Sequence, residues 1–438
     1  MNILSHKLST THELLTSRGG LLTIATLMQK INLTNLIDTH FVLPKSNRGF
    51  NPSTFISSLI LMQHEGGIRL DDLKYLKKDE ALTKLLGLKN IPQPDSVGDW
   101  LRRTGANGVN SISLINKELC SIALKDTKQI TLDIDASEIR SHKKEAKKTY
   151  KFNHGYMPMV GHIAEINHVI ETDFREGNVS PKTKNLEFIK KCRDNLPDGV
   201  ELSYLRIDCA GYQKSIIKYC DEQNIHFAIR AMMSKSIRSY INSLAEIDWE
   251  PVIISGKESK MCSHRTTHKI SNYEKPFTLI IQRTPKSGQQ QLDFDEESDN
   301  LQAGGYVHRA IATSLNSMSD SEIINWYNMR AEKSENKIKE LMLDFGAAHM
   351  PCGQFQANAL YFSICTLSYN LFVMLRNHLP DEFKKSRAKA VRLRIYAMAA
   401  KLIKHSRQYK FKLQKLNQNL LLQIINKIKR YQFHSVLE

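Results

Sequence analysis

The sequence has no pair of cysteines at CxxC spacing and no uninterrupted hydrophobic run long enough to span a membrane. Its seven cysteines are odd in number and scattered along the chain, which favours reduced thiols over a disulfide framework. The longest apolar stretch, residues 359–375, is interrupted by polar side chains and predicts a buried helix. Residues 1–20 hold no continuous apolar core, so we expect no signal peptide. These absences predict a cytoplasmic protein without a membrane partner.

Motifs of two common enzyme classes are also missing. The chain contains neither a Walker-type glycine-rich loop for phosphates nor the nucleophile turn of serine hydrolases. ATP-driven and serine-hydrolase activities therefore lose their usual support. What is present is a chain of 438 residues, of which 41% are hydrophobic and 24% charged. These values are typical of a folded globular protein of two or three domains.

Positive charge is in excess and is unevenly distributed. Lysine and arginine total 62 against 45 acids, a net charge of +17, which favours nucleic acid as partner, with an acidic membrane surface second. Residues 381–438 contain 15 lysines and arginines but three acids, and so carry +12 of that surplus. We predict that this tail positions DNA phosphates; a solvated helix face is the alternative. The predicted contact residues are Arg392, Arg394, Lys401, Lys404 and Arg407.

The periodicity of the chain changes near residue 128. Residues 1–125 have apolar positions at helical spacing, and residues 95–103 begin a helix that carries paired arginines, as in a helix laid on DNA. A helical domain with a solvated basic edge is the alternative. At residues 130–135 apolar and polar side chains alternate. This alternation predicts a strand with Asp133 and Asp135 on one face.

A second candidate acid follows another predicted strand. Residues 202–207 form that strand, and Asp208, a turn, a helix and a strand at 225–229 come after it. Because ligands bind at the carboxyl ends of strands in open α/β sheets, Asp208 is a candidate site residue. Residues 232–318 depart from this alternation and predict an inserted β-rich subdomain.

A long helix follows the insertion and supplies the third acid. Ser319 and Glu322 are placed as a capping box, and Gly346 ends a helix of about 25 residues that carries Glu332 and Glu335. Three carboxylates at one sheet edge suit Mg²⁺ or Mn²⁺. Such a site can hold two ions roughly 4 Å apart that act on a phosphodiester.

Three segments carry these acids: residues 132–137 (LDIDAS), 206–212 (RIDCAGY) and 327–341 (YNMRAEKSENKIKEL). In this order they resemble the three acidic motifs of bacterial insertion-sequence DDE transposases, most closely those of the insertion sequence 1380 family. The similarity extends over roughly residues 90–410. Further matching segments are residues 174–178, 350–355 with Asn358, 368–372 and 394–404.

The resemblance implies an α/β fold: an RNase H-like catalytic core with a β-rich insertion before the last catalytic helix, flanked by helical N- and C-terminal regions. The 127 positions from Asp208 to Glu335 agree, because they are too many for an uninterrupted core. The expected domains are a helical DNA-binding region at 1–125, the first part of the core at 126–231, the insertion at 232–318, the last part of the core at 319–380 and a basic helical region at 381–438.

The resemblance also assigns the first two acids. The first carries over to Asp135, because the family pattern has serine or threonine two places later, here Ser137. Asp133 lies on the same face of the strand and is the alternative. The second acid carries over to Asp208.

The third acid departs from the family pattern, which is tyrosine, two residues, arginine, three residues, glutamate, six residues, lysine. Tyr327 and Arg330 fit this pattern, but the glutamate position falls on Ser334. We assign the acid to Glu335, one residue late, because its downstream match is longer; Glu332 is the alternative.

The same pattern implies DNA contacts on this helix. Tyr327 and Arg330 would hold phosphates near the scissile bond, and helix packing with a surface ion pair is the alternative role. The final lysine of the pattern falls on Met342, so that contact is missing or is made by Lys339.

The predicted function is that of a transposase that binds the terminal inverted repeats of its insertion sequence, cuts the DNA and joins the ends to target DNA. Asp135, Asp208 and Glu335 are the predicted catalytic residues and ligands of Mg²⁺, for which Mn²⁺ can substitute. The resemblance implies a homodimer that brings two DNA ends together in a synaptic complex, in a bacterial cytoplasm and on the nucleoid when bound. The alternatives are a metal-dependent nuclease that does not join DNA and an inactive DNA-binding relic.

Overall fold

The computed structural model describes residues 7, 9–45, 49–271, 273–286, 300–406 and 408–431, and the side chains of Glu332 and Lys333 lie outside this description. The chain forms two compact units. Residues 116–339 form one, here called the sheet unit, and residues 1–115 with 340–438 form the other, here called the terminal unit. The structure therefore has two units where the sequence predicted five consecutive domains. The two terminal regions share one unit, and residues 340–380, which we expected in the core, belong to it as well.

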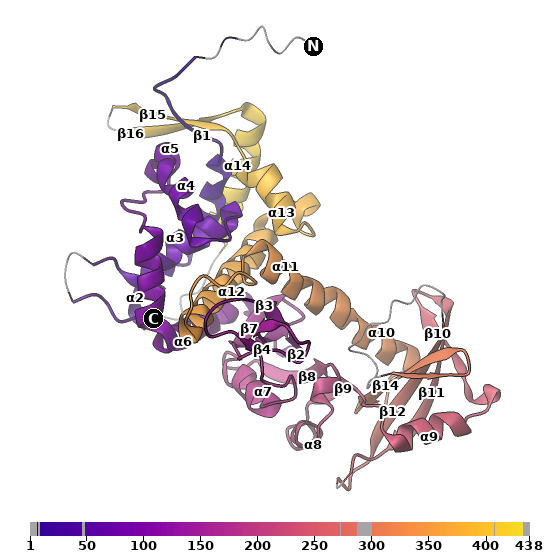
Figure 1. The fold of residues 1–438 in the computed structure, drawn as a ribbon. Helices are drawn as coiled ribbons and strands as arrows, with labels where there is room; N and C mark the ends of the chain where they lie inside the picture. Colours follow the sequence, from indigo (N-terminus) through magenta and orange to yellow (C-terminus); the bar gives the residue numbers. More distant parts are fainter. Residues whose placement is uncertain are drawn as a thin grey trace. The chain divides into compact units, whose positions relative to one another are not determined.

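The terminal unit is mainly helical (Figure 1). Its helix α12, Phe355–His378, is long and apolar enough to cross a membrane, but its most apolar window is fully buried in the protein. The predicted buried helix is therefore confirmed. The other helices are α1 Leu22–Lys30, α2 Leu33–His40, α3 Pro52–Glu65, α4 Leu73–Lys78, α5 Glu80–Leu85, α6 Pro94–Ala123, which continues beyond residue 115, α13 Ala388–Val391 and α14 Lys415–Arg430.

A three-stranded antiparallel sheet also belongs to the terminal unit, in the order β1-β15-β16 (Figure 1). Its strands are β1 Leu14–Thr16, β15 Ala400–His405 and β16 Gln408–Leu413. The prediction of a helical region at 381–438 is therefore wrong for residues 400–405 and 408–413. Ala400 and Leu402 are buried and the residues between and beyond them are more exposed, the period-two pattern of a strand, which the abundance of lysine obscures in the sequence.

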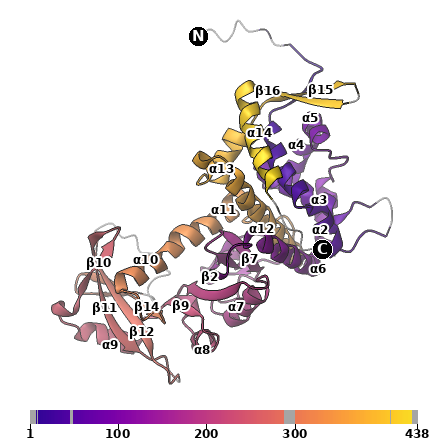
Figure 2. The same ribbon diagram turned by 180° about the vertical axis from the view of Figure 1, so that it is seen from behind.

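The sheet unit contains a ten-stranded mixed sheet in the order β10-β11-β12-β14-β9-β8-β2-β6-β7, with β13 paired to β14 (Figure 1, Figure 2). Strands β2, β8 and β9 are parallel to one another, and β6 and β7 continue the sheet in antiparallel pairing. The strands are β2 Gln129–Ala136, β6 Met159–Ile163, β7 His168–Asp173, β8 Glu201–Ile207, β9 His226–Arg230, β10 Glu250–Ile254, β11 Lys257–His268, β12 Phe277–Pro285, β13 Leu301–Ala303 and β14 Tyr306–Thr313.

Smaller elements complete the sheet unit. A second, three-stranded sheet has the order β3-β5-β4. Its strands are β3 Ile139–Arg140, β4 Lys147–Lys148 and β5 His154–Tyr156. The helices are α7 Asn185–Asp194, α8 Lys214–Glu222, α9 Lys235–Ser243, α10 Asp320–Arg330 and α11 Asn336–Asp344, which continues into the terminal unit.

Strand β2 has the two faces that its sequence predicts. Ile130, Leu132 and Ile134 are buried in the main hydrophobic core of the sheet unit. Asp133 and Asp135 alternate with them and point to the opposite face, as expected for a strand. The mixed α/β class is confirmed by this architecture of a large mixed sheet with many helices.

The strands of the expected insertion extend the large sheet instead of forming a separate subdomain. Strand β14 pairs with β9, so the β-rich segment continues the sheet beyond its parallel strands. Ile280 and Ile311 from this segment pack with Ile323 and Ile324 of α10 in a second core. The segment is thus part of the support for the helix that follows it.

The helix after the insertion begins and ends where the sequence predicts. Ser319 and Glu322 form the capping box, and Gly346 has a φ of +73° in the left-handed region that glycine favours. Helical structure continues through α10 and α11, but a π-helical segment, Ala331–Glu335, separates them. The sequence periodicity does not predict this segment.

Candidate active site

Two acids lie at the carboxyl ends of adjacent parallel strands. In the pairing of β2 with β8, Ile134 lies opposite Ile207. Asp135 follows Ile134 within β2, and Asp208 follows Ile207 directly after the end of β8. Neighbouring strands are about 4.8 Å apart, which places the two carboxylates at one edge of the sheet. The Asp208 carboxylate accepts a hydrogen bond from the Ala210 backbone N–H at 2.9 Å, which fixes the turn that follows β8.

Asp133 has a different role from Asp135. Its side chain is 0% exposed, and both of its oxygens accept hydrogen bonds from Arg206, at 2.7 and 2.8 Å. Arg206 also donates to the backbone carbonyl of Trp326 in α10 at 2.5 Å and lies over the Trp326 ring. The Asp133–Arg206 pair therefore fastens α10 to the sheet and leaves Asp135 as the acid of β2 that faces the sheet edge.

Arg330 joins the first acid to the third. Its guanidinium donates to Asp135 at 2.8 Å, to Glu335 at 3.0 Å and to the Ile134 carbonyl at 3.1 Å. Arg330 is nearly buried, with a side chain 7% exposed, whereas the Glu335 side chain is 50% exposed. The structure thus brings Asp135, Arg330 and Glu335 together beside Asp208.

The π-helical segment explains why Glu335 comes one residue late. A π turn spans one residue more than an α turn, so it adds a residue without rotating the rest of the helix. Glu335 therefore stacks above Arg330 five positions later, where an α-helix would place residue 334. Ser334 itself is fully buried. The side chain of Glu332, the alternative third acid, lies outside the described residues.

The electrostatics of the cluster follow from its burial and its charges. Burial raises the pKa of Asp135 to about 6; Arg330 opposes this shift, and the negative charges of Asp208 and Glu335 add to it. Burial alone would lower the pKa of Arg330, but Asp135, Tyr327, Asp208 and Glu335 together hold it above its ordinary value. Asp208 and Glu335 therefore each interact with Asp135 and with Arg330, and negative charge is concentrated at the sheet edge.

Tyr327 lies one helical turn before Arg330 on the same helix. Its hydroxyl donates to the Ile207 carbonyl at 3.3 Å, next to Asp208. Burial raises its pKa to about 12, so the phenol stays protonated at neutral pH. Tyr327 thus lies next to the residue that precedes Asp208. Lys339, four positions after Glu335, is exposed.

The predicted tail residues have different environments. Arg392 donates to the backbone carbonyls of Gln63 and His64, each at 2.8 Å, and of Asp344, and so caps the ends of α3 and α11. Its donors are thus engaged within the protein, and the predicted contact of Arg392 with DNA stays a prediction. Arg394 and Lys404 are exposed, and Lys401 pairs with Glu13. Arg407 lies outside the described residues.

The acid cluster fits a hard divalent cation by its chemistry. Carboxylate oxygens are the donors that Mg²⁺ prefers, and the cluster already gathers around a cation, the Arg330 guanidinium. Across the described residues, no group of three or more aspartate, glutamate, histidine or cysteine side chains is arranged so that it could hold a metal ion, and this includes the three acids as they stand here. A bound ion would therefore have to share Asp135 and Glu335 with Arg330 or displace it.

Two residues that support the site were not predicted from the sequence. Arg206 and Trp326 connect β8 to α10 beneath the acids, and Arg206 is 1% exposed. An arginine between Leu205 and Ile207, in the buried end of the strand and two residues before a candidate acid, is the signal that indicates a buried ion pair. Without the fold, the partner of that arginine cannot be chosen from the 45 acids of the chain.

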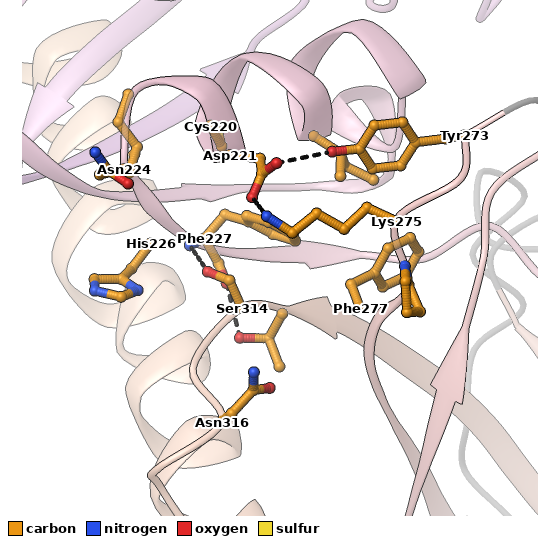
Figure 3. A pocket seen from close by; sticks show the side chains of 14 residues that line it. Cys220, Asp221, Asn224, His226, Phe227, Tyr273, Lys275, Phe277, Ser314 and Asn316 are labelled. Atoms are coloured by element: carbon orange, nitrogen blue, oxygen red, sulfur yellow. Dashed lines mark hydrogen bonds and ion pairs between the residues drawn. The ribbon is translucent and has the colours of Figure 1, made fainter.

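A hollow of about 350 Å³ lies elsewhere in the sheet unit (Figure 3). It opens at the start of β9, near His226, whereas Asp208 follows the other end of the parallel strand β8. Its polar groups are engaged with one another: Asp221 accepts from Tyr273 and Lys275, and Ser314 accepts from the Phe227 N–H (Figure 3). The hollow is therefore separate from the acid cluster.

Comparison with known proteins identifies the family. A search of curated proteins found no match. Among solved structures, the chain is similar to a piggyBac transposase in a synaptic complex with hairpin DNA, with 12% identity, a TM-score of 0.40 and coverage of 98% of this chain and 85% of that chain. A likeness of this strength supports no conclusion about activity. A family model described as "Transposase DDE domain group 1" matches residues 5–433, and the chain therefore belongs to this family of DDE transposase domains.

Proposed function

We propose that the protein is an active transposase that cleaves DNA at the ends of its element and joins those ends to target DNA. The observation that carries this proposal is the meeting of acids from three distant segments. Asp135, Asp208 and Glu335 interact electrostatically at one edge of the sheet, and Arg330 bridges two of them. Metal-dependent phosphodiester chemistry uses such a concentration of carboxylates to hold its ions.

Asp135, Asp208 and Glu335 would hold Mg²⁺ or Mn²⁺. When bound, such ions activate an attacking oxygen and stabilise the leaving oxygen of a phosphodiester. The chain's own contribution is to hold the three carboxylates at the sheet edge before DNA arrives. The backbone N–H of Ala210 orients Asp208, and the Asp133–Arg206 pair fixes the helix that carries Glu335.

The helix also offers donors to DNA. Arg330 keeps a permanent positive charge beside the acids, and the Tyr327 phenol remains a hydrogen-bond donor at neutral pH. We infer that both contact the phosphate at the scissile bond, and that the exposed Lys339 contacts one farther along the strand. DNA would then draw Arg330 away from the carboxylates.

The strand order supports a finer assignment of the fold. The strands β7-β6-β2-β8-β9 join an antiparallel trio to two parallel strands, with Asp135 and Asp208 at adjacent strand ends. We propose that these strands are an RNase H-like core and that β10–β14 are an insertion that extends it. A homodimer would hold two DNA ends together for joining.

The test uses a labelled duplex that carries the element's own end, with Mg²⁺, with Mn²⁺ and with EDTA. We expect metal-dependent nicking by the wild type and its loss in Asp208→Ala and Glu335→Ala. Glu332→Ala is the matched control, because it removes a neighbouring glutamate from the same helical segment. A precut end then separates joining from nuclease activity. Equal cleavage by Glu335→Ala and the wild type contradicts the assignment, and binding without cleavage under either metal contradicts the activity.

A further inference from the structure

The small sheet of the terminal unit has one packed face and one open face. On the packed face, Ala400 and Leu402 are buried, and the Phe411 ring lies so close to Gly19 that a side chain there would collide with it. The period of two puts Lys401, Lys410 and Lys412 together on the opposite face. The hairpin is therefore fixed to the protein by one face and presents lysines on the other.

The lysines of the open face do not stabilise the hairpin by their own interactions. Lys401 lies directly opposite Lys412 in the antiparallel pair, and like charges in that position destabilise a sheet. Lys410 and Lys412 are exposed, and residues 383–437 contain no acid. Glu13 pairs with Lys401 but carries a single negative charge. The open face therefore keeps an excess of positive charge.

We propose that this open face, with Lys401, Lys410 and Lys412, binds the sugar–phosphate backbone of duplex DNA. The proposal rests on the proposed function and names a surface for its substrate. Lys410 and Lys412 are two residues apart on β16, so their side chains stand ~6.8 Å apart on one face and can contact the same sugar–phosphate backbone. Ile403, paired with Lys410, lies on the same face between the lysines.

Lysines on an edge strand also prevent strands of different molecules from pairing. A charge reversal separates the two roles, because glutamate protects an edge as well as lysine does. Lys412→Glu moreover places a carboxylate opposite Lys401, which favours the hairpin. The double variant Lys410→Glu/Lys412→Glu should therefore fold as the wild type does and differ in the sign of its surface charge.

The experiment measures binding of the full chain to a labelled random duplex of about 30 base pairs over a series of salt concentrations, in EDTA. In the double variant we expect at least about tenfold weaker binding near ~0.1 M salt and a salt slope smaller by about 2. Lys410→Gln/Lys412→Gln should show a smaller loss in the same direction. Lys214→Glu/Lys218→Glu, two exposed lysines of α8, is the control with the same change in net charge, and its binding should stay near the wild-type value.

The possible outcomes are distinguishable. An unchanged salt slope in Lys410→Glu/Lys412→Glu, or an equal loss in the α8 control, overturns the proposal. So does a loss of binding to anionic lipid vesicles without a loss of binding to DNA, which would identify a membrane surface instead. If the wild type binds duplex DNA but never cuts its element end, and Lys410→Glu/Lys412→Glu alone loses that binding, the proposed function fails and the DNA-binding surface stands.

Discussion

At the scale of single residues, two aspartates on one face of β2 have opposite tasks. Asp133 is fully buried in a two-bond ion pair with Arg206, and Asp135 faces the other acids at the sheet edge. From the sequence, both are acids at alternate positions of one strand. The neighbouring strand decides between them, because the register places Arg206 opposite Asp133.

Asparagine at position 133 should therefore mainly lower stability, and asparagine at position 135 should mainly abolish DNA cleavage. Asp133→Asn leaves the buried Arg206 charge uncompensated, and we expect a loss of about 3–5 kcal/mol in the free energy of unfolding. Asp135→Asn removes a carboxylate whose pKa is raised to about 6, so that its ionised form opposes folding at neutral pH. We expect stability within about 1 kcal/mol of the wild type and no DNA cleavage. Urea unfolding in EDTA at pH 7 and a cleavage assay check both, and equal destabilisation by the two substitutions would contradict this division.

His64 predicts a pH dependence of the terminal unit. The Ser368 carbonyl, 3.2 Å from Nε2, can only accept, so Nε2 carries the proton and Nδ1 accepts from the Tyr396 hydroxyl at 2.9 Å. Burial lowers the pKa of His64 to about 3, and the charge of Arg392 lowers it as well. The unfolded chain binds a proton near pH 6.5 and the folded one near pH 3. The contribution of His64 is therefore complete above pH 6.5 and is lost as the pH falls from there toward 3.

We expect unfolding free energy to fall by up to about 1.4 kcal/mol per pH unit from this group below pH 6.5. Glutamine at the same position does not titrate, so His64→Gln should show a shallower fall although it is less stable at neutral pH. Unfolding curves at several pH values between about 7.5 and 5 measure the difference. Parallel pH profiles for variant and wild type would show that His64 is not the group responsible.

At the scale of elements, the π-helical segment explains how Glu335 lies beside Arg330 although it comes one residue later than the family pattern expects. The family pattern expects its glutamate at residue 334, and the chain has Ser334 there and Glu335 next. The extra residue is absorbed within Ala331–Glu335, so Ile338 and Leu341 still face the core. The position of the third acid is therefore a property of the helix geometry and not of residue counting.

A one-residue deletion tests this geometry. Deleting Ser334 should convert the segment to a regular α turn, restore the family spacing from Arg330 to the glutamate, and leave the rest of the helix facing as before. We expect a folded protein that still cleaves DNA. Inserting one alanine after Ser334 rotates the glutamate by about 100° and should abolish cleavage. Circular dichroism and the cleavage assay compare the two, and an unfolded deletion variant would mean that the extra residue is needed for packing.

The same scale shows what the sequence can predict. Strands such as β2 and β8 are recognisable because apolar residues dominate or alternate over a short run, and α10 because Ser319 and Glu322 cap it. The hairpin at β15 and β16 is not recognisable, because only Ala400 and Leu402 on its first strand are buried. Partners across the sheet, such as Arg206 for Asp133, depend on register and lie beyond any local pattern.

At the scale of the whole molecule, the terminal unit is formed by the two ends of the chain. Residues 1–115 and 340–438 share that unit, and residues 116–339 form the sheet unit between them in sequence. Helix α14 buries Leu421, Ile424 and Ile428 and packs against α1 and α12. The basic tail is therefore part of the core of the terminal unit as well as a charged surface.

Deleting residues 414–438 should for this reason do more than remove charge. It exposes the apolar surface of α1 that α14 covers, so the N-terminal helices should become sensitive to protease while residues 116–339 resist it. Limited proteolysis with mass spectrometry identifies the surviving fragment. Ile424→Asp should reproduce the effect with all basic residues in place, since it puts a charge in the same buried contact. Equal resistance of both units in the truncated protein would show that α14 is dispensable for the fold.

This nesting of one unit within the sequence of the other sets an order for synthesis. A ribosome releases residues 1–115 long before residues 340–438 exist, so the early helices must wait for the last part of the chain before their unit can close. The lysine-bearing hairpin and the strand β1 that it pairs with are also made at opposite ends of translation. A nascent chain can therefore form the strands that carry Asp135 and Asp208 while the small lysine-bearing sheet is still incomplete, and a chain that stops early never gains the lysine surface.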